Sequence, residues 1–452
     1  MALSPPRVDR ALDNYYIATA GPAASRPPLT ERVDADVCVI GAGFAGLATA
    51  LGLIERGVRD VVVVEAAQVG HGASGRNGGF VFGGYSLDCA ALLEQQGLER
   101  ARALYALTRQ AVGTIRTRIA RHAIDCEAVE GGALLANWFD DDTILRRQQA
   151  VMADAFGVDW RYIPRDEMPA YARSARYRAG LLEADAFHFH PLKYARGIAA
   201  AIEAAGGRIH EHSAAVRIES AGPGRDAGHR VHMAPHGPLR GMTATSGLSG
   251  ATGTVRAKHV VVAAGGYLRG LVPALERAML PIATYVMATE PLGAAAAEHI
   301  PSRCAIYDTR FAFDYYRRLN DTRLLWGGRI SIRERAPADI ARILQADLRK
   351  VYPGLADARV EFAWGGLMSY ARHQMPQIGR LPDGVWHALG FGGYGVGPTT
   401  VAGEALAETL ATGRPLPVGF GDYGLPRVWG RAGLLAAQFR YSWAELRDWW
   451  RQ

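Results

Sequence analysis

The chain has 452 residues, of which 49% are hydrophobic, so it can bury a large core in two domains or in one interleaved α/β unit. Its net charge of +7 comes mainly from scattered arginines that form no run interleaved with aromatics, so no nucleic-acid partner is expected. No stretch approaches the ~18 apolar residues of a membrane span. The four cysteines show no C-x-x-C spacing, so we expect no metal, no disulfide framework and a cytoplasmic location.

The N-terminal residues 1–30 contain two proline pairs and no apolar core of the signal-peptide type, which predicts an extended arm. A buried strand then runs into the turn GAGFAG and into a helix predicted over 44–56. Gly41 allows a tight turn, Gly43 lets the backbone approach a pyrophosphate, and Gly46 lets the helix pack closely on the strand. The first N–H groups of that helix would face the phosphates of a dinucleotide.

An acidic residue ends the second strand of this unit, predicted over 61–64. Glu65 lies about 20 residues after Gly46, where a carboxylate accepts hydrogen bonds from an unphosphorylated ribose and repels a 2′-phosphate. FAD or NAD is therefore favoured over NADP. An ordinary βαβ unit with a glycine-rich bend is the alternative, but strand, turn, helix and acid all stand in the register of a dinucleotide site.

A second glycine-rich stretch, 70–80, follows directly. Its glycines expose backbone that can approach a flat ring or a phosphate, and Ser74, Arg76 and Asn77 supply donors for an anion or for ring carbonyls. A flexible surface loop would have the same composition, so this stretch alone leaves both interpretations open.

Further helices are predicted over 90–121, 143–156 and 192–205, and short strands over 208–212 and 215–219. His188 and His190 precede the third helix on one face of an extended segment. No carboxylate or cysteine is near them in the sequence, which favours a structural role over metal binding.

The stretch 221–254 is rich in Gly, Pro, Ser and Thr and predicts a poorly packed hairpin insertion. A buried strand, 259–263, then ends in a glycine pair. Strands predicted over 282–289, 313–319 and 323–330, with a helix over 337–351, indicate the antiparallel sheet of a substrate domain.

A third glycine-rich turn, GFGGYGVG, joins a strand at 385–389 to a helix predicted over 401–410. Three such turns are what a split dinucleotide domain with an inserted substrate domain would need. A flavin placed against this last helix would have its N1–C2=O edge, where negative charge collects on reduction, next to backbone N–H groups.

The motifs GAGFAG, GASGRNGG, AAGGY, WGG and GFGGYGVG, in this order, resemble the D-amino-acid oxidase superfamily, and look most like γ-glutamylputrescine oxidase-type enzymes. The resemblance implies an α/β fold with a split Rossmann-like FAD-binding domain of the glutathione-reductase type and an inserted antiparallel-sheet substrate domain. It implies oxidation of a C–N bond in a small amine or amino acid by hydride transfer to flavin N5, giving an imine that water hydrolyses.

The resemblance also implies non-covalent FAD, because the segment 364–379, where some family members carry a linking cysteine, has none; His71 is the alternative attachment point. Sarcosine oxidases carry a substrate-binding lysine where this chain has Gly397, so a sarcosine-like substrate is not expected. No catalytic residue is assigned. The candidate residues on the substrate side are His71, Tyr316, Arg329 and Arg372, of which the resemblance implies Tyr316 and Arg329. Arg329 or Arg372 could anchor a substrate carboxylate, but a surface role is favoured for each. The residues implied in FAD binding are Gly41, Gly43, Phe44, Ala45, Gly46, Glu65, Ala66, Ser74, Arg76, Asn77, Gly78, Val216, Ala264, Gly265, Gly393, Tyr394, Gly395, Val396 and Gly397.

The C-terminal tail combines tryptophans with arginines. We expect it to dock on its own domain or on a sister subunit rather than in a membrane interface, because its aromatics do not form one clean face with the basic residues opposite. The expected domains are an arm at 1–30, an FAD-binding domain at 31–90, 186–270 and 360–415, a substrate domain at 91–185 and 271–359, and a helical tail at 416–452.

Two classes of function stay open. The favoured one is an oxidase for a small amine or amino acid that passes electrons to O2, with a dehydrogenase using another acceptor as its variant. The other is a flavoprotein acting on RNA or on a protein-borne group, for which the net charge of +7 is the only support. A homo-oligomer is compatible with either class.

Overall fold

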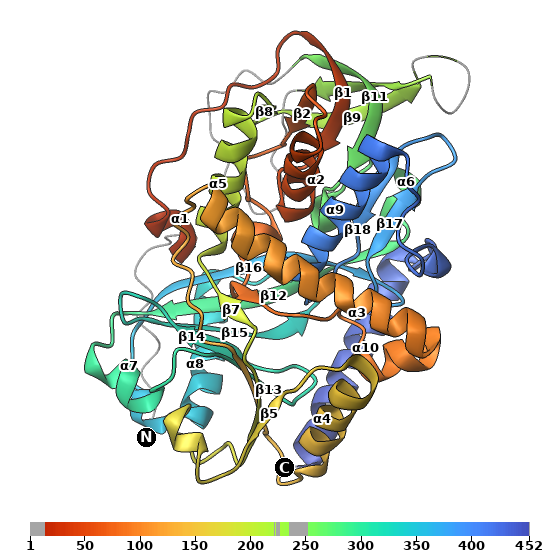
Figure 1. The fold of residues 1–452 in the computed structure, drawn as a ribbon. Helices are drawn as coiled ribbons and strands as arrows, with labels where there is room; N and C mark the ends of the chain where they lie inside the picture. Colours follow the sequence, from red (N-terminus) through yellow and green to blue (C-terminus); the bar gives the residue numbers. More distant parts are fainter. Residues whose placement is uncertain (1–13, 221, 223–226, 235–251, 452) are drawn as a thin grey trace.

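The computed structural model describes residues 14–220, 222, 227–234 and 252–451. Two large sheets dominate the fold, one above the other in Figure 1, and the long helix α3 (Cys89–Arg121) runs diagonally past both. Within the described ranges no helix is long and apolar enough to cross a bilayer.

The first sheet has the strand order β17-β18-β11-β1-β2-β8, with β10 paired to β11 and β9 to β10. Its centre is parallel, since β1 pairs in parallel with both β11 and β2. The four valines of β2 are all buried because both sheet faces are covered: Val61 and Val63 join one hydrophobic cluster, while Val62 and Val64 join another. The strands are β1 (Arg32–Ile40), β2 (Val61–Val64), β8 (Arg208–His210), β9 (Ala214–Ser220), β10 (His229–Ala234), β11 (Thr254–Val262), β17 (Gln377–Arg380) and β18 (Trp386–Leu389).

Helices α2 (Phe44–Glu55), α5 (Pro191–Ala204) and α9 (Val396–Thr412) form the helical layer beside this sheet. Helices α2 and α9 approach very closely, since a Cβ on Gly403 would overlap the Cβ of Ala48. Arg118 of α3 connects them: its Nη2 lies 2.6 Å from Glu55 Oε2 and 2.5 Å from Glu404 Oε1, and the residue is only 1% exposed. Segments from both ends of the chain therefore pack into one layer.

The second sheet has the order β16-β12-β15-β14-β13-β4-β6-β5 and is antiparallel except between β13 and β4. Residues 360–371 were expected in the FAD-binding domain, but they form β16, which pairs with β12 from Val360 to Ala371, so they belong to this sheet. The strands are β4 (Ala133–Ala136), β5 (Arg161–Ile163), β6 (Gly180–Glu183), β12 (Met279–Thr289), β13 (Ala305–Asp308), β14 (Tyr315–Arg318), β15 (Leu324–Ser331) and β16 (Val360–Ala371).

The predicted hairpin insertion at 221–254 lies partly outside the described residues. Within it, β10 pairs with both β9 and β11, and Val231 is fully buried, so this part is better packed than its composition indicates. His188 and His190 have structural roles: the His188 Nε2 lies 2.9 Å from the Arg303 carbonyl oxygen, and the His190 Nδ1 accepts from the Lys193 N–H at the start of α5. Among the described residues no cluster of His, Cys, Asp and Glu could bind a metal.

The two ends of the described chain both pack on the second sheet. Tyr15 and Tyr16 of the N-terminal arm are buried, and the Tyr16 ring lies 5.5 Å from that of Trp364. The C-terminal helix α10 contacts β12 and β15 and extends into the lower part of the molecule, toward the C-terminus (Figure 1). The remaining elements are α1 (Tyr15–Thr19), α4 (Thr143–Phe156), α6 (Pro273–Glu276), α7 (Ala294–His299), α8 (Pro337–Val351), α10 (Gly430–Trp450), β3 (Phe80–Val81) and β7 (Phe187–His188).

Candidate functional site

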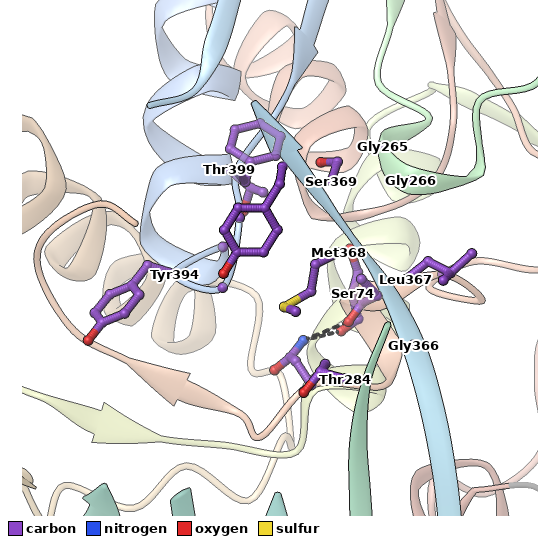
Figure 2. Close-up of a pocket in the computed structure, with 18 of the residues that line it drawn as sticks. Ser74, Gly265, Gly266, Thr284, Gly366, Leu367, Met368, Ser369, Tyr394 and Thr399 are labelled. Carbon is purple, nitrogen blue, oxygen red and sulfur yellow. Dashed lines mark hydrogen bonds between the residues drawn. The ribbon is translucent and has the colours of Figure 1, made fainter. Parts of the chain in front are cut away.

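A continuous cavity of about 980 Å³ lies between the two sheets and is lined by residues of both. This volume is at the upper end of the roughly 300–1,000 Å³ typical of small-molecule sites. One end is lined by the glycine turns of the first sheet, and the other by aromatic and charged residues of the second. Figure 2 shows part of its wall, where Ser74, Thr284 and Tyr394 come from three distant segments of the chain.

The turn between β1 and α2 forms one end of the cavity. Gly41 has φ +109°, and a Cβ there would lie 2.8 Å from the Ala263 carbonyl oxygen, so only glycine fits. Gly43 is the N-cap of α2 and has no side chain to cap the helix; the Ser74 Oγ accepts the Phe44 N–H instead (2.9 Å), and the positive end of the helix is directed at the cavity. Gly46 does not line the cavity; a Cβ there would overlap the Gly41 carbonyl oxygen, so its role is close packing.

The Glu65 carboxylate is fixed in place at the end of β2. Its Oε2 accepts the backbone N–H of Ala42 (2.8 Å) and its Oε1 that of Ala67 (2.9 Å). Burial raises the pKa of Glu65, and these backbone donors oppose that shift. Each carboxylate oxygen can accept further hydrogen bonds, so Glu65 presents an oriented acceptor to a ligand in the cavity.

The GASGRNGG stretch is an ordered wall of the cavity and not a flexible surface loop. Asn77 braces it, because its Nδ2 donates to the Ser74 carbonyl oxygen (2.8 Å) and its Oδ1 accepts from the Gly79 N–H (2.8 Å). The Arg76 Nε donates to the His71 carbonyl oxygen, and the Arg76 carbonyl oxygen accepts from the Trp364 indole of β16 (2.9 Å). The two sheets are therefore joined through this stretch.

Helix α9 points its N-terminus at the middle of the cavity. It begins at Val396, five residues before the predicted start at 401, so Gly397 lies in its first turn. Its cap residue, Gly395, makes no side-chain hydrogen bond, which leaves the first N–H groups of the helix available to a ligand. Ser86 supports the turn before the helix, since its Oγ accepts from the Tyr394 N–H (3.2 Å).

Strand β16 supplies lining residues that the sequence analysis missed. Gly366 to Tyr370 all line the cavity, and Figure 2 shows the Met368 side chain projecting into it between Ser74 and Tyr394. Ser369 braces the third glycine turn, because its Oγ accepts from the Gly390 N–H (3.1 Å). Large apolar residues at every second position, Val360, Phe362 and Trp364, are the sequence signal that could have identified this strand.

Aromatic side chains surround the second-sheet end of the cavity. The Phe82 ring lies 5.7 Å from Tyr307 and 5.0 Å from Tyr394, and the Phe313 ring lies 6.2 Å from that of Tyr315. Tyr315 packs so closely over Gly78 and Gly327 that a Cβ at either position would overlap its ring. These contacts make a compartment with a largely apolar wall.

The acidic groups near this compartment are paired with arginines. Asp308 Oδ2 lies 2.6 Å from Arg310 Nη2, which also pairs with Asp314. The pKa of Asp314 is raised to about 7, mainly because the carboxyl group is buried. Arg329 lines the cavity but binds both carboxylate oxygens of Asp347 at 2.7 Å.

Two of the residues expected on the substrate side lie elsewhere. Tyr316 is fully buried on the opposite face of β14, where its ring stacks on Trp326 at 4.3 Å, because successive side chains of a strand point to opposite faces. Arg372 lies outside the cavity, 5.3 Å above the ring of Trp429.

The other expected residues line the cavity. His71 does so, as do all the residues expected to bind FAD except Gly46. The sequence analysis missed Arg440 and Tyr441, which α10 contributes to the second-sheet end; no pattern in the sequence places the tail there. Among the described residues, Arg440 makes no ion pair with an acidic side chain.

These features fit an FAD molecule. Gly41 and Gly43 leave room for a pyrophosphate against the start of α2, and Glu65 lies at the end of the neighbouring strand, where it can accept from a ribose. The uncapped start of α9 can face the flavin edge. The cavity continues beyond this point into the aromatic compartment, which leaves space for a small substrate.

Two comparisons of the sequence with known proteins agree on the type of protein. The sequence pattern of the family described as FAD-dependent oxidoreductase matches residues 36–409. γ-Glutamylputrescine oxidoreductase of Escherichia coli K12 is 34% identical over 399 residues, which are 88% of each chain, and the probable oxidoreductase OrdL of Haemophilus influenzae is 29% identical over 403 residues, again 88% of each chain.

Solved structures show the same fold. Glycine oxidase from Geobacillus kaustophilus superposes with a TM-score of 0.69 at 19% identity, covering 87% of this chain and 99% of that one. L-amino acid deaminase from Proteus vulgaris also gives 0.69, at 18% identity, covering 90% of this chain and 100% of that one. At these identities the similarity supports the fold alone.

Proposed function

Because the chain belongs to the family of FAD-dependent oxidoreductases, we propose that it oxidises a C–N bond in a small amine or amino acid. FAD, bound non-covalently as is typical of the family, supplies the hydride acceptor in this reaction. The product is an imine that water hydrolyses after release. The resemblance to γ-glutamylputrescine oxidoreductase favours an amine with an amino-acid end among the candidate substrates.

The main support is the aromatic compartment, which continues from the cofactor end of the cavity. A substrate amine must be neutral to lose hydride from the adjacent carbon, since only a free lone pair stabilises the developing iminium. An apolar wall disfavours the ammonium form. Asp308, which lines this compartment, is neutralised by Arg310, so it does not present an unpaired carboxylate to the amine.

Arg440 would bind the acidic end of such a substrate. The two arginines expected in this role are engaged elsewhere, Arg329 with Asp347 and Arg372 over Trp429. Arg440 lines the same compartment from α10, and a guanidinium can bind a carboxylate through two parallel hydrogen bonds. The amine would then lie toward Tyr315 and the cofactor, with the carboxylate toward α10.

We further propose O2 as the electron acceptor and the cytoplasm as the compartment. Solved structures with this fold carry the names of an oxidase and of a dehydrogenase, and the choice of O2 follows the resemblance to γ-glutamylputrescine oxidase-type enzymes. All four cysteines are described and free, which suits a reducing compartment.

The decisive experiment is flavin reduction in anaerobic stopped flow with primary amines, γ-glutamyl-amines, D-amino acids and N-methyl amino acids. We expect γ-glutamyl-amines to bleach the flavin fastest, with a rate that rises with pH through one ionisation of the bound amine. Adding O2 to the reduced enzyme should then restore the flavin spectrum. Reduction by NADPH, or by none of these compounds, would contradict the proposal.

A further inference from the structure

The outer face of the C-terminal helix α10 is strongly apolar. We define this face as Leu435, Phe439, Trp443, Leu446 and Trp450, which recur every three or four residues and so share one side of the helix. Their exposed fractions run from 40% for Leu446 to 74% for Phe439, whereas exposed apolar residues of soluble proteins are usually scattered singly. These five residues therefore form one exposed apolar stripe, although Tyr441 of the same helix lies away from it and lines the cavity.

Contacts on the inner side of α10 orient the helix so that this apolar face points outward. Asp448 is buried and its Oδ2 accepts from the Phe311 N–H (2.7 Å), while Gln438 Oε1 accepts from the Ile332 N–H (3.2 Å). Ala444 is also buried. The helix thus docks on its own chain, as expected, but through its polar and small residues, and this docking turns the large apolar ones outward.

The acidic and basic residues of α10 lie on different sides of the helix. Its two acidic residues turn inward, since Asp448 is buried and Glu445 lies 3.8 Å from Arg329. Its arginines are all exposed, and Arg431 and Arg447 border the outer face. The outward side of the helix therefore combines large apolar groups with positive charge alone.

From these observations we propose that the outer face of α10 docks the protein on a bilayer containing anionic phospholipids. Trp, Phe and Leu side chains enter the headgroup region readily, and flanking arginines attract anionic lipids. A second copy of the chain fits less well. Two-fold packing of this face would bring the arginine rows of both helices together, with no outward acidic residue on either helix to compensate.

The experiment is co-sedimentation of the FAD-loaded full chain with vesicles of phosphatidylcholine alone and of equal parts phosphatidylcholine and phosphatidylglycerol. We expect binding to the anionic vesicles, much weaker binding to the neutral ones, and loss of binding as salt is added. Equal binding to both kinds of vesicle, or binding to neither kind, would overturn the proposal.

Variants then test the face itself. The combined substitutions Phe439→Ser, Trp443→Ser and Trp450→Ser should weaken vesicle binding by more than about tenfold. Ile17→Ser with Leu98→Ser, two exposed apolar residues outside α10, is the matched control and should leave it unchanged. Flavin absorbance and activity in solution should be the same in all of these proteins.

The role of charge is tested separately. Arg431→Gln with Arg447→Gln should weaken binding to anionic vesicles by about fivefold per arginine, and Arg32→Gln with Arg59→Gln, exposed in the first sheet and its loops, should have no such effect. Sedimentation velocity without lipid completes the test. If wild type is a dimer that the three serine substitutions dissociate, a second copy covers the face and the proposal is wrong.

Discussion

Single residues decide which atoms the cavity presents. Tyr315 and Tyr316 are neighbours in sequence, yet Tyr315 lines the aromatic compartment and Tyr316 stacks on Trp326 in the core beneath. A strand turns successive side chains to opposite faces, so an error of one position in assigning the inward face moves a residue out of the site.

Glu65 is the residue that we expect to select the ribose. Glu65→Arg removes the acceptor of the Ala42 and Ala67 N–H groups and buries a positive charge, so FAD affinity should fall by about 3 kcal/mol, or roughly 100-fold. Equilibrium dialysis of the apoprotein with FAD measures this. The milder Glu65→Gln is the control, and unchanged affinity in both variants would contradict the role of Glu65.

Arg440 is the residue that we expect to bind the substrate carboxylate. Arg440→Gln should raise the KM of γ-glutamyl-amines about tenfold with little change in kcat, because the contact is remote from the reacting C–N bond. Primary amines without a carboxylate should show no change. Arg440→Lys should recover part of the loss, whereas an equal effect on both substrate types would point to a structural role.

Glu183 should make stability depend on pH. Its carboxylate accepts one hydrogen bond, from the Gly83 N–H (3.2 Å), and burial raises its pKa from 4.5 to about 7. The folded protein therefore keeps a proton that the unfolded chain releases, so the contribution to stability is complete below the unfolded pKa and is lost as pH rises through about 7.

The expected loss is up to about 3 kcal/mol between about pH 4.5 and pH 7. Urea unfolding across this range should show a smaller decrease in the Glu183→Gln variant, because a neutral amide does not titrate. Asp185→Asn, an exposed neighbour, is the control. Parallel curves for wild type and Glu183→Gln would show that Glu183 ionises normally.

At the scale of elements, close packing of two helices determines where the third glycine turn lies. Gly403 allows α9 to approach α2, and this contact brings the N-terminal ends of both helices to the same cavity. Gly403→Val should push the helices apart and destabilise the protein by about 1–3 kcal/mol.

Thermal unfolding and FAD affinity should both decrease in Gly403→Val. Gly413→Val is not a fair comparison because Gly413 has φ +77°, so the control is Gly113→Val, a helical glycine with open space around it. If Gly403→Val lowers the unfolding temperature and the FAD affinity no more than Gly113→Val does, the contact between α2 and α9 is less tight than its geometry indicates.

Strand β16 shows how an element can belong to two functions. It pairs with β12 in the second sheet, yet its Ser369 supports the third glycine turn and its Trp364 binds the carbonyl oxygen of Arg76. The sequence of β16 carries the alternation typical of a strand. It does not predict which strand β16 pairs with, or which segments its side chains contact.

At the scale of the whole molecule, FAD should be retained by contacts on both sheets without a covalent bond. None of the four cysteines lines the cavity, and His71 does. We therefore expect acid precipitation to give a colourless pellet and a yellow supernatant. A yellow pellet would identify a covalent link, with His71→Ala as the variant that should abolish it.

Much of the fold followed from the sequence. The resemblance and the α/β class with FAD are confirmed, and helices such as α4 and α8 begin and end where predicted. The GAGFAG turn could be identified because its requirements are local: positive φ at Gly41 and close packing at Gly46 exclude other residues whatever the rest of the chain does.

Other features depend on contacts between distant segments, which no local pattern encodes. The sequence by itself determined the strands, the glycine turns and the cofactor class, because these follow from periodicity and backbone conformation. Only the tertiary structure decided that β16 joins the second sheet, that Asp347 occupies Arg329, and that α10 brings Arg440 to the cavity and turns its apolar face outward. Each of these results from pairing, charge neutralisation or burial against a partner far away in the chain.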